Sequence, residues 1–148
     1  MSAPVIEVRH VTRILQEAAS PVMLVHDAAF SVSPGEFVAI LGPSGCGKSS
    51  LLYLMGLLDR PTEGDVLING NSTAHMTSDE LTDLRLEKIG FIFQFHFLLP
   101  EFTAQENVSL PMKKLGRLRK DEIDARALRL LADLGLEGNA QKRPDKMS

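Results

Sequence analysis

The sequence predicts an α/β fold in one domain, and three observations support this. Short apolar runs bounded by turn residues alternate along the chain with segments of helical periodicity. The continuous apolar run 37–41 has the pattern of a strand buried on both faces, as in parallel sheets. It leads directly into a glycine-rich loop, and the segment after that loop has apolar residues at helical spacing.

Length and composition are compatible with this fold. The chain has 148 residues, of which 44% are hydrophobic and 24% charged, as in soluble globular domains. The formal net charge of -3 argues against general binding to nucleic acid. The chain has no apolar stretch long enough to span a membrane, its N-terminus does not resemble a secretory signal, and its single cysteine excludes an internal disulfide. These features favour the cytoplasm.

The strands are predicted from alternating or continuous apolar residues and from the turns beside them. Five segments fit these patterns: residues 5–11, 28–32, 37–41, 65–68 and 89–93. Residues 33–36 (SPGE) have turn chemistry, and Asn69-Gly70 is a strong signal for a tight turn. The segment 13–21 has no clear period and is predicted to be a loop.

The helices are predicted from their caps and their apolar faces. Residues 48–58 carry a helical apolar stripe. Thr77 with Glu80 fits a capping box that opens a helix reaching about residue 88, and Thr103 with Glu106 fits a second one. In the helix predicted over 121–134, one face is apolar: Ile123, Ala127, Leu130, Leu131 and Leu134. Gly135 then stands at the position of a C-terminal cap.

The most informative motif is the loop 42–49, GPSGCGKS, which matches G-x-x-x-x-G-K-[ST], the phosphate-binding P-loop. Glycines allow the backbone to curl so that its N–H groups face a phosphate, and the following helix adds its positive dipole end. The pattern therefore predicts a nucleoside triphosphate site, with ATP and Mg²⁺ as the ligands. The predicted nucleotide-binding residues of the loop are Gly42, Pro43, Ser44, Gly45, Cys46, Gly47, Lys48, Ser49 and Ser50.

Three side chains of this loop have predicted roles. Lys48 brings a cation to the outer phosphates and is the catalytic candidate. The Ser49 hydroxyl is a candidate ligand of Mg²⁺, and Ser50 is placed to reach an inner phosphate. Cys46 is either a small space-filling residue or a reactive thiol, and the sequence leaves both open.

Beyond the loop, residues 89–111, IGFIFQFHFLLPEFTAQENVSLP, closely resemble the Q-loop region of ABC-transporter ATPase subunits. The resemblance is to the lipoprotein-releasing and macrolide-exporter branch. The segments 27–35 (DAAFSVSPG) and 56–64 (GLLDRPTEG) and the pair Arg143-Pro144 match the same branch. The resemblance extends over residues 5–148.

This resemblance implies a P-loop NTPase of the ABC ATPase type. It would comprise an N-terminal antiparallel β-subdomain, a partial parallel sheet and the start of a helical subdomain. Residues 1–148 would form one incomplete nucleotide-binding domain, with the helical subdomain beginning at residue 95.

The resemblance also implies roles for single residues. Gln94 would contact Mg²⁺ and the attacking water; the alternative is that Gln94 is an ordinary polar residue at the end of a strand. Leu15 stands where the family usually stacks an aromatic residue on adenine. The apolar segment 95–102 would face a partner, or else fill a core.

The resemblance also bears on hydrolysis. The family's signature segment LSGGQ would begin at Met147-Ser148, and the family's second acidic motif, catalytic glutamate and switch histidine have no counterpart in the sequence. The expectation is therefore a chain that binds ATP and hydrolyses it poorly. Because the strand from that missing region would normally lie beside 37–41, aggregation, an oligomer or a separately encoded remainder is expected as well.

The function that the resemblance implies is that of the ATP-binding subunit of an ABC exporter, or of its N-terminal part. Its partners would be an integral-membrane permease and a second ATPase subunit, bound in a nucleotide-dependent dimer on the cytoplasmic face of the inner membrane. The alternative is a regulatory fragment that binds ATP without hydrolysing it. A P-loop kinase or GTPase would need base-reading or acceptor motifs, and none was found.

One further feature of the sequence is its basic segment 113–120 (KKLGRLRK), which is either a solvated linker or a contact with anionic lipid.

Overall fold

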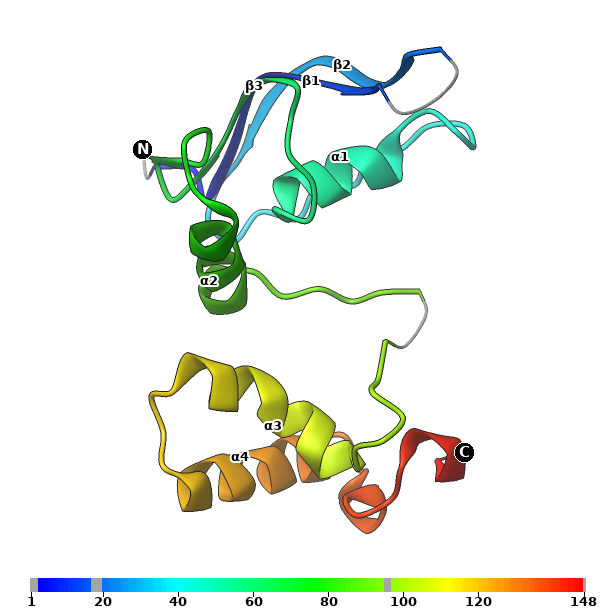
Figure 1. Ribbon diagram of the computed structural model, residues 1–148, viewed down its shortest axis with the longest axis vertical. Coiled ribbons are helices and arrows are strands. Elements are labelled where there is room, and N and C mark those ends of the chain that lie inside the picture. Colours follow the sequence, from blue (N-terminus) through cyan, green and yellow to red (C-terminus); the bar gives the residue numbers. More distant parts are fainter. Residues whose placement is uncertain (1–2, 17–19, 95–96, 148) are drawn as a thin grey trace. The chain divides into compact units, whose positions relative to one another are not determined.

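The computed structural model describes residues 3–16, 20–94 and 97–147. The chain divides into two compact units, residues 1–85 and residues 86–148 (Figure 1). Phe95 of the predicted partner-facing segment and Ser148 of the predicted signature start lie outside the described residues.

The first unit contains an antiparallel sheet of four strands in the order β2-β1-β3-β4. Val8 of the central strand β1 pairs with Phe30 on one side and with Val66 on the other. Asn69 and Gly70 connect β3 to β4 with φ angles of 50° and 79°, which is the left-handed backbone that a tight hairpin turn requires. The strands are β1 (Ile6–Leu15), β2 (Val22–Val32), β3 (Glu63–Ile68) and β4 (Asn71–Ser72).

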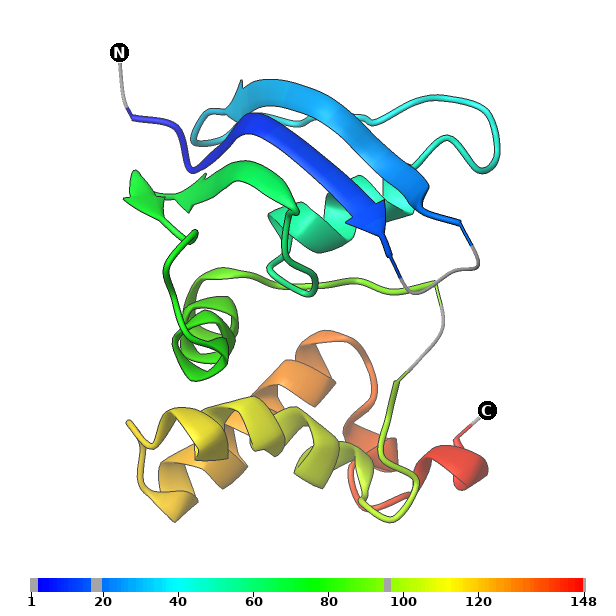
Figure 2. The same cartoon turned by 45° about the horizontal axis from the view of Figure 1, so that its top comes forward.

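Two helices complete this unit: α1 (Lys48–Met55) and α2 (Ser78–Lys88), whose last residues extend past the boundary at residue 85. Helix α1 lies against one face of the sheet in both views (Figures 1 and 2). The fully buried residues of the unit are Leu54 from α1 and Val11 and Val66 from the sheet. Burial of such side chains contributes about 1.5–3 kcal/mol each, so Leu54 helps to hold α1 in this unit.

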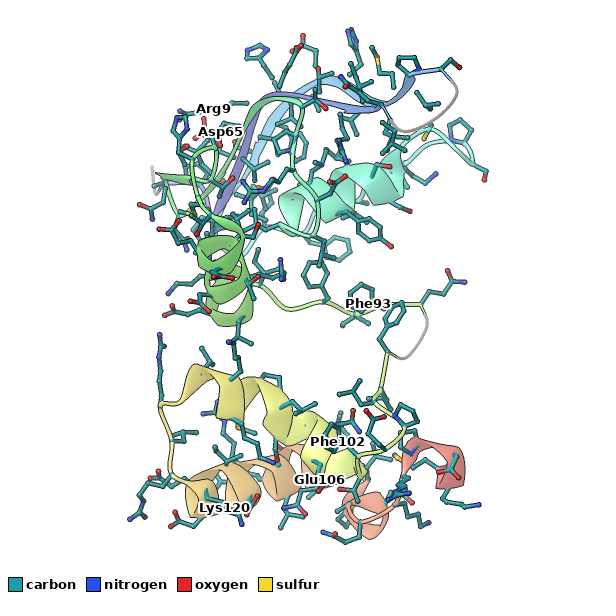
Figure 3. All side chains as sticks on the ribbon, viewed as in Figure 1. Arg9, Asp65, Phe93, Phe102, Glu106 and Lys120 are labelled. Atoms are coloured by element: carbon teal, nitrogen blue, oxygen red, sulfur yellow. The ribbon has the colours of Figure 1, made fainter. Side chains whose placement is uncertain are left out.

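The second unit contains α3 (Ala104–Leu115) and α4 (Lys120–Asp133), followed by two short 3-10 turns, Glu137–Asn139 and Pro144–Lys146. Glu106 and Lys120 mark the starts of the two helices in Figure 3. Ala104, Leu131 and Ala140 form a small buried cluster against which Val108, Leu136 and Met147 pack. No helix in the described part of the chain is long and apolar enough to cross a membrane.

Both predicted capping boxes are confirmed. The backbone N–H of Thr77 donates to Glu80 Oε2 at 2.7 Å, and that of Thr103 donates to Glu106 Oε2 at 2.8 Å. In each pair the threonine hydroxyl accepts from the glutamate N–H in return, at 3.3 Å and 3.2 Å. The predicted cap at Gly135 is confirmed by its φ of 69°.

Two predicted strands are wrong. The segments 37–41 and 89–93 are not strands, and large parts of their side chains face solvent: Phe37 is 95% exposed, Leu41 88% and Ile92 103%. An extended segment satisfies its backbone N–H and C=O groups only beside a second strand. All four described strands pair within the antiparallel sheet, and none of them pairs with these segments.

Three other boundaries differ from the prediction. Residues 13–15 continue β1, and β2 begins at Val22, so the predicted loop is shorter; residues 17–19 of it are outside the described part. The helix predicted to residue 58 ends at Met55. On α4 the apolar face is narrower than predicted, because Leu130 is 44% and Leu134 75% exposed.

The early end of α1 has a local cause. Leu57 has φ 57°, a left-handed conformation that usually belongs to glycine. Its N–H donates to Leu54 O at 3.1 Å, and the N–H of Leu58 donates to Tyr53 O at 2.8 Å. These two bonds are the Schellman pattern that closes a helix. The sequence pattern does not predict this end of the helix, because a leucine occupies the position where a glycine is expected.

Candidate functional site

The loop 42–49 connects the coil at 37–41 to the first residue of α1. Gly45 and Gly47 have φ angles of 80° and 92°, which side chains with a Cβ rarely adopt. The backbone also turns tightly between them, where the N–H of Cys46 donates to Pro43 O at 3.4 Å. The curl of the loop therefore requires glycine at both positions; the motif specifies Gly47, whereas Gly45 occupies one of its variable positions.

Space restricts Gly47 strictly and Gly42 less, because the atom nearest to a Cβ at Gly42 belongs to the end of a side chain that can move. A Cβ at Gly47 would overlap the carbonyl oxygen of Leu24 on β2, and one at Gly42 would lie 2.6 Å from Cys46 Sγ. Real Cβ atoms essentially never show contacts that short. The loop therefore lies directly against strand β2 at Gly47, and only glycine allows that approach. This backbone cradle, which added side-chain atoms would disturb, fits a ligand bound by main-chain N–H groups.

Lys48 lies across the loop. Its Nζ donates to Gly42 O at 2.9 Å and to Pro43 O at 2.7 Å, and it is 3.8 Å from Cys46 Sγ. The ammonium group thus stays beside the loop backbone, where it adds a full positive charge to the partial charges of the N–H groups. This is the electrostatic arrangement that binds a polyphosphate.

The N-terminus of α1 is electropositive, like the ammonium group of Lys48. Gly47 occupies the N-cap position without a side-chain cap, and the first turn has no acidic residue. The first intrahelical bond is from Leu51 N to Gly47 O at 2.9 Å. The N–H groups of Lys48, Ser49 and Ser50 therefore have no partner within the helix and can bind an anion, with the helix dipole in favour.

Two pockets flank the loop, of about 320 Å³ and about 360 Å³, and both are lined by Met23, Leu24, Gly47 and Lys48. The first also contains Ser44, Gly45, Ser49 and Ser50, and the second also contains Cys46. Most of the predicted loop residues thus line two adjoining spaces beside strand β2. Gly42 and Pro43 belong to the site because their carbonyl groups accept hydrogen bonds from Lys48 Nζ.

Leu15 and Gln94 differ from the loop residues. Leu15 ends β1, is half-buried and pairs with Val22, but it is not among the residues that line either pocket. Gln94 belongs to the second unit, where it follows the coil 89–93 and is exposed. The roles assigned to these two residues remain predictions.

The sequence did not single out the start of β2 as part of the site. Val22 and Met23 are 45% and 54% exposed, and together with Leu24 they form an apolar wall beside the loop. The signal was present in the sequence as the apolar run 22–25, VMLV, just after the segment interpreted as a loop. An apolar wall beside a phosphate cradle suits a ligand with both a planar apolar part and an anionic part.

Comparison with known proteins points to one family. The family described as ABC transporter matches residues 25–148. The lipoprotein-releasing system ATP-binding protein LolD 1 of Chlorobium chlorochromatii (strain CaD3) is 50% identical over 125 residues, which are 84% of this chain and 51% of the relative. The chain therefore spans about half the length of that relative.

Two solved structures of the ATP-binding cassette MJ0796 are similar to this chain. The dimeric post-hydrolysis state bound to ADP and Pi has a TM-score of 0.88 and 38% identity. A second dimeric structure, described as a bacterial ABC transporter cassette, has a TM-score of 0.87 and 39% identity. Each match covers 97% of this chain and 63% of the solved chain. The predicted P-loop fold of the ABC ATPase type is confirmed by this likeness.

Proposed function

Because the chain belongs to the ABC transporter family, we propose that it is a nucleotide-binding part of an ATP-binding subunit and that the loop 42–49 holds the phosphates of ATP. The observation that carries the proposal is the glycine cradle against strand β2, with Lys48 Nζ across it. It is supported by the solved relative, which was bound to ADP and Pi.

In this proposal the phosphates take the place of the carbonyl groups as the partners of Lys48. The N–H groups of the loop and of the first turn of α1 donate to phosphate oxygens, which are strong acceptors. Ser49 Oγ makes no hydrogen bond to another described residue and is available to Mg²⁺. Mg²⁺ binds through few protein groups together with phosphate oxygens, so a single hydroxyl here suits it.

The base of the nucleotide would pack against aliphatic side chains. Met23 and Leu24 line both pockets, and Leu15 is paired with Val22 at the neighbouring end of β1. We propose that the adenine lies on this aliphatic end of the two strands. Packing on such residues lacks the aromatic stacking energy of about 0.5–1.5 kcal/mol, so the preference for adenine over other bases should be weak.

The proposal for the whole protein is transport. The relative from Chlorobium chlorochromatii is named for lipoprotein release, and the solved relatives are dimeric. We propose that this chain is the nucleotide-binding part of a subunit that powers lipoprotein release or export through a separate membrane permease, at the cytoplasmic face of the membrane. We also propose that a second ATPase subunit joins it when nucleotide is bound. Gln94, whose amide is exposed, is proposed to contact Mg²⁺ and the attacking water.

Nucleotide binding is tested by equilibrium titration of the purified chain with labelled ATP, with and without Mg²⁺. Lys48→Ala should weaken ATP binding by about tenfold or more, because a charge-assisted contact to phosphate is lost. Lys142→Ala removes an exposed lysine of the second unit and should leave binding unchanged. Equal affinity of Lys48→Ala and the unchanged chain, with both folded by circular dichroism, would refute the proposal.

The transport role is tested separately, by affinity capture of the tagged chain from detergent-solubilised membranes of its own host. Mass spectrometry should find a polytopic membrane protein at a stoichiometric level. Recovery of the chain without any such protein, under conditions where it binds ATP, would refute the permease partnership and leave nucleotide binding intact.

A further inference from the structure

A pocket of about 430 Å³ in the first unit is lined by three arginines and one carboxylate. It lies where the end of α1, strand β1 and helix α2 meet: Arg13 comes from β1, Asp59 and Arg60 from the segment after α1, and Arg85 from α2. None of its lining residues lines the two pockets beside the loop 42–49. It is therefore a site separate from the proposed nucleotide site.

Each arginine is held in place by a neighbour. Arg13 Nε donates to Asp59 Oδ2 at 2.7 Å, Arg60 Nη2 donates to Met76 O at 2.8 Å, and Arg85 Nη1 donates to Leu57 O at 2.6 Å. A guanidinium has five N–H donors, and these contacts use only part of them. The three groups are thus oriented by the fold and keep donors for a ligand.

The charge of the pocket is unbalanced. Among the described residues that line the pocket, Asp59 is the single carboxylate, and it is already engaged with Arg13 and with the backbone N–H of Arg60, at 2.8 Å. The Arg13 side chain is 24% exposed and that of Asp59 32% exposed, so this pair is shielded from solvent in part. Arg60 and Arg85 therefore remain without an anionic partner among the described lining residues, and an anion is the ligand that would balance them.

Part of the pocket wall is aliphatic, between its charged and hydroxyl side chains. Leu57 and Leu81 are 5% and 6% exposed, and Leu58, at 43%, is partly open to solvent. An adjoining pocket of about 190 Å³ shares Leu57 and Leu81 and is lined by the fully buried Leu54 and by Val66. A ligand that fills both spaces would place an aliphatic group next to its anionic group.

We infer that this arginine pocket is a docking site for a polypeptide segment in which a glutamate or aspartate is flanked by aliphatic residues. Arginine binds carboxylates through two parallel N–H···O bonds, which gives such contacts their specificity. A phosphate group fits less well, because its second negative charge would be repelled by Asp59 and it would leave the leucine wall uncovered. The inference goes beyond nucleotide binding and does not depend on it.

The test uses two capped peptides, Ala-Leu-Glu-Leu-Leu-Ala and the same peptide with glutamine for glutamate, together with a phosphoserine version. Each is titrated into the isotopically labelled full chain, and the arginine Nε–H and backbone N–H signals are followed by NMR. The glutamate peptide should shift the signals of Arg60 and Arg85 and bind about tenfold more tightly than the glutamine peptide, because the glutamine lacks the charge.

A matched pair of variants locates the site. Arg60→Gln removes a guanidinium whose one hydrogen bond within the described residues is to Met76 O. It should weaken binding of the glutamate peptide about fivefold to tenfold. Arg9→Gln removes a guanidinium of β1 that is paired with Glu7 outside the pocket and should leave peptide binding unchanged (Figure 3). ATP affinity should stay within about twofold in both, since separate sites act independently.

Three results would overturn the inference. The first is equal binding of the glutamate and glutamine peptides, or no shift of Arg60 and Arg85 at millimolar peptide. The second is tighter binding of the phosphoserine peptide, which would make the site one for phosphate. The third is equal loss of binding in Arg9→Gln and Arg60→Gln. If Arg60→Gln does not fold, the comparison of the peptides on the unchanged chain decides.

Discussion

Gly45 and Gly47 show how different the demands on two neighbouring glycines can be. Both have a left-handed backbone, with φ angles of 80° and 92°. A Cβ at Gly45 would meet nothing within 4 Å, whereas one at Gly47 would overlap the carbonyl oxygen of Leu24. The first position therefore requires glycine for its backbone alone, and the second requires it for both backbone and space.

This difference predicts unequal effects of two alanine substitutions. Gly45→Ala should destabilise the first unit by about 1–2 kcal/mol, the usual penalty of a left-handed residue with a Cβ. Gly47→Ala should cost at least about 1–3 kcal/mol, and it should also displace the loop from β2 and weaken ATP binding strongly. Chemical denaturation measures the first effect and ATP titration the second. Equal effects at the two positions would show that the contact with Leu24 is unimportant.

At the scale of the element, helix α3 begins with a capping box whose hydrogen bonds favour the charged form of its glutamate. The backbone N–H of Thr103, and then its side chain, lower the pKa of Glu106 from the ordinary value of 4.5. The carboxylate is fully exposed, so its effect on the helix comes from these local hydrogen bonds rather than from burial. Glu80 beside Thr77 repeats the pattern in the first unit, with its pKa lowered by the same kind of contact.

The direction of this pKa shift predicts a pH dependence. Above pH 4.5 the glutamate is ionised in both folded and unfolded chains, so its stabilising effect on the folded state is fully present. Below that value the unfolded chain takes up the proton first, and the stabilisation is lost as the pH falls through the lowered pKa of the folded state. Chemical denaturation of the second unit between pH 7 and pH 3 should show this loss.

Glu106→Gln provides the comparison, because the amide keeps an acceptor but carries no charge. Its stability should fall less steeply below pH 4.5 than that of the unchanged chain. Glu101→Gln changes an exposed glutamate in the preceding turn and serves as the control. Identical pH profiles for the unchanged chain and Glu106→Gln would contradict the proposed role of the capping charge.

At the scale of the whole molecule, the apolar residues do not all contribute to a core. Leu54 of α1 is fully buried, while Phe37 is 95% exposed and Ile92 103%. Large apolar residues at the surface contribute little to folding and favour association with other chains. We therefore predict that self-association of this chain occurs through the segments 37–41 and 89–93.

The difference in burial between Leu54 and Phe37 predicts different effects of two substitutions. Leu54→Ala should destabilise the first unit by about 2–5 kcal/mol, because it leaves a cavity. Phe37→Ser should change stability by no more than about 0.5 kcal/mol, as surface substitutions usually do, and should reduce association. Denaturation and sedimentation velocity measure the two properties. A large loss of stability in Phe37→Ser would show that the segment is packed in solution.

The sequence by itself determined the features that depend on neighbouring residues. The loop 42–49, both capping boxes, the turn at Asn69-Gly70 and the cap at Gly135 were predicted and found. Each is stabilised by hydrogen bonds or backbone angles within a few residues, so the residue types at a fixed spacing are sufficient to specify it. The same holds for the likeness to ABC ATPases, whose motifs are continuous stretches of sequence.

Only the tertiary structure decided the features that depend on distant partners. Whether 37–41 and 89–93 become strands depends on a neighbouring strand, and no local pattern reveals whether one is present. The wall of Met23 and Leu24 beside the loop, and the meeting of Arg13, Arg60 and Arg85, likewise join residues far apart in the sequence. Strand pairing and packing join residues far apart in the sequence. For that reason, apolar periodicity predicts where a helix or strand can form better than it predicts which segment packs beside it.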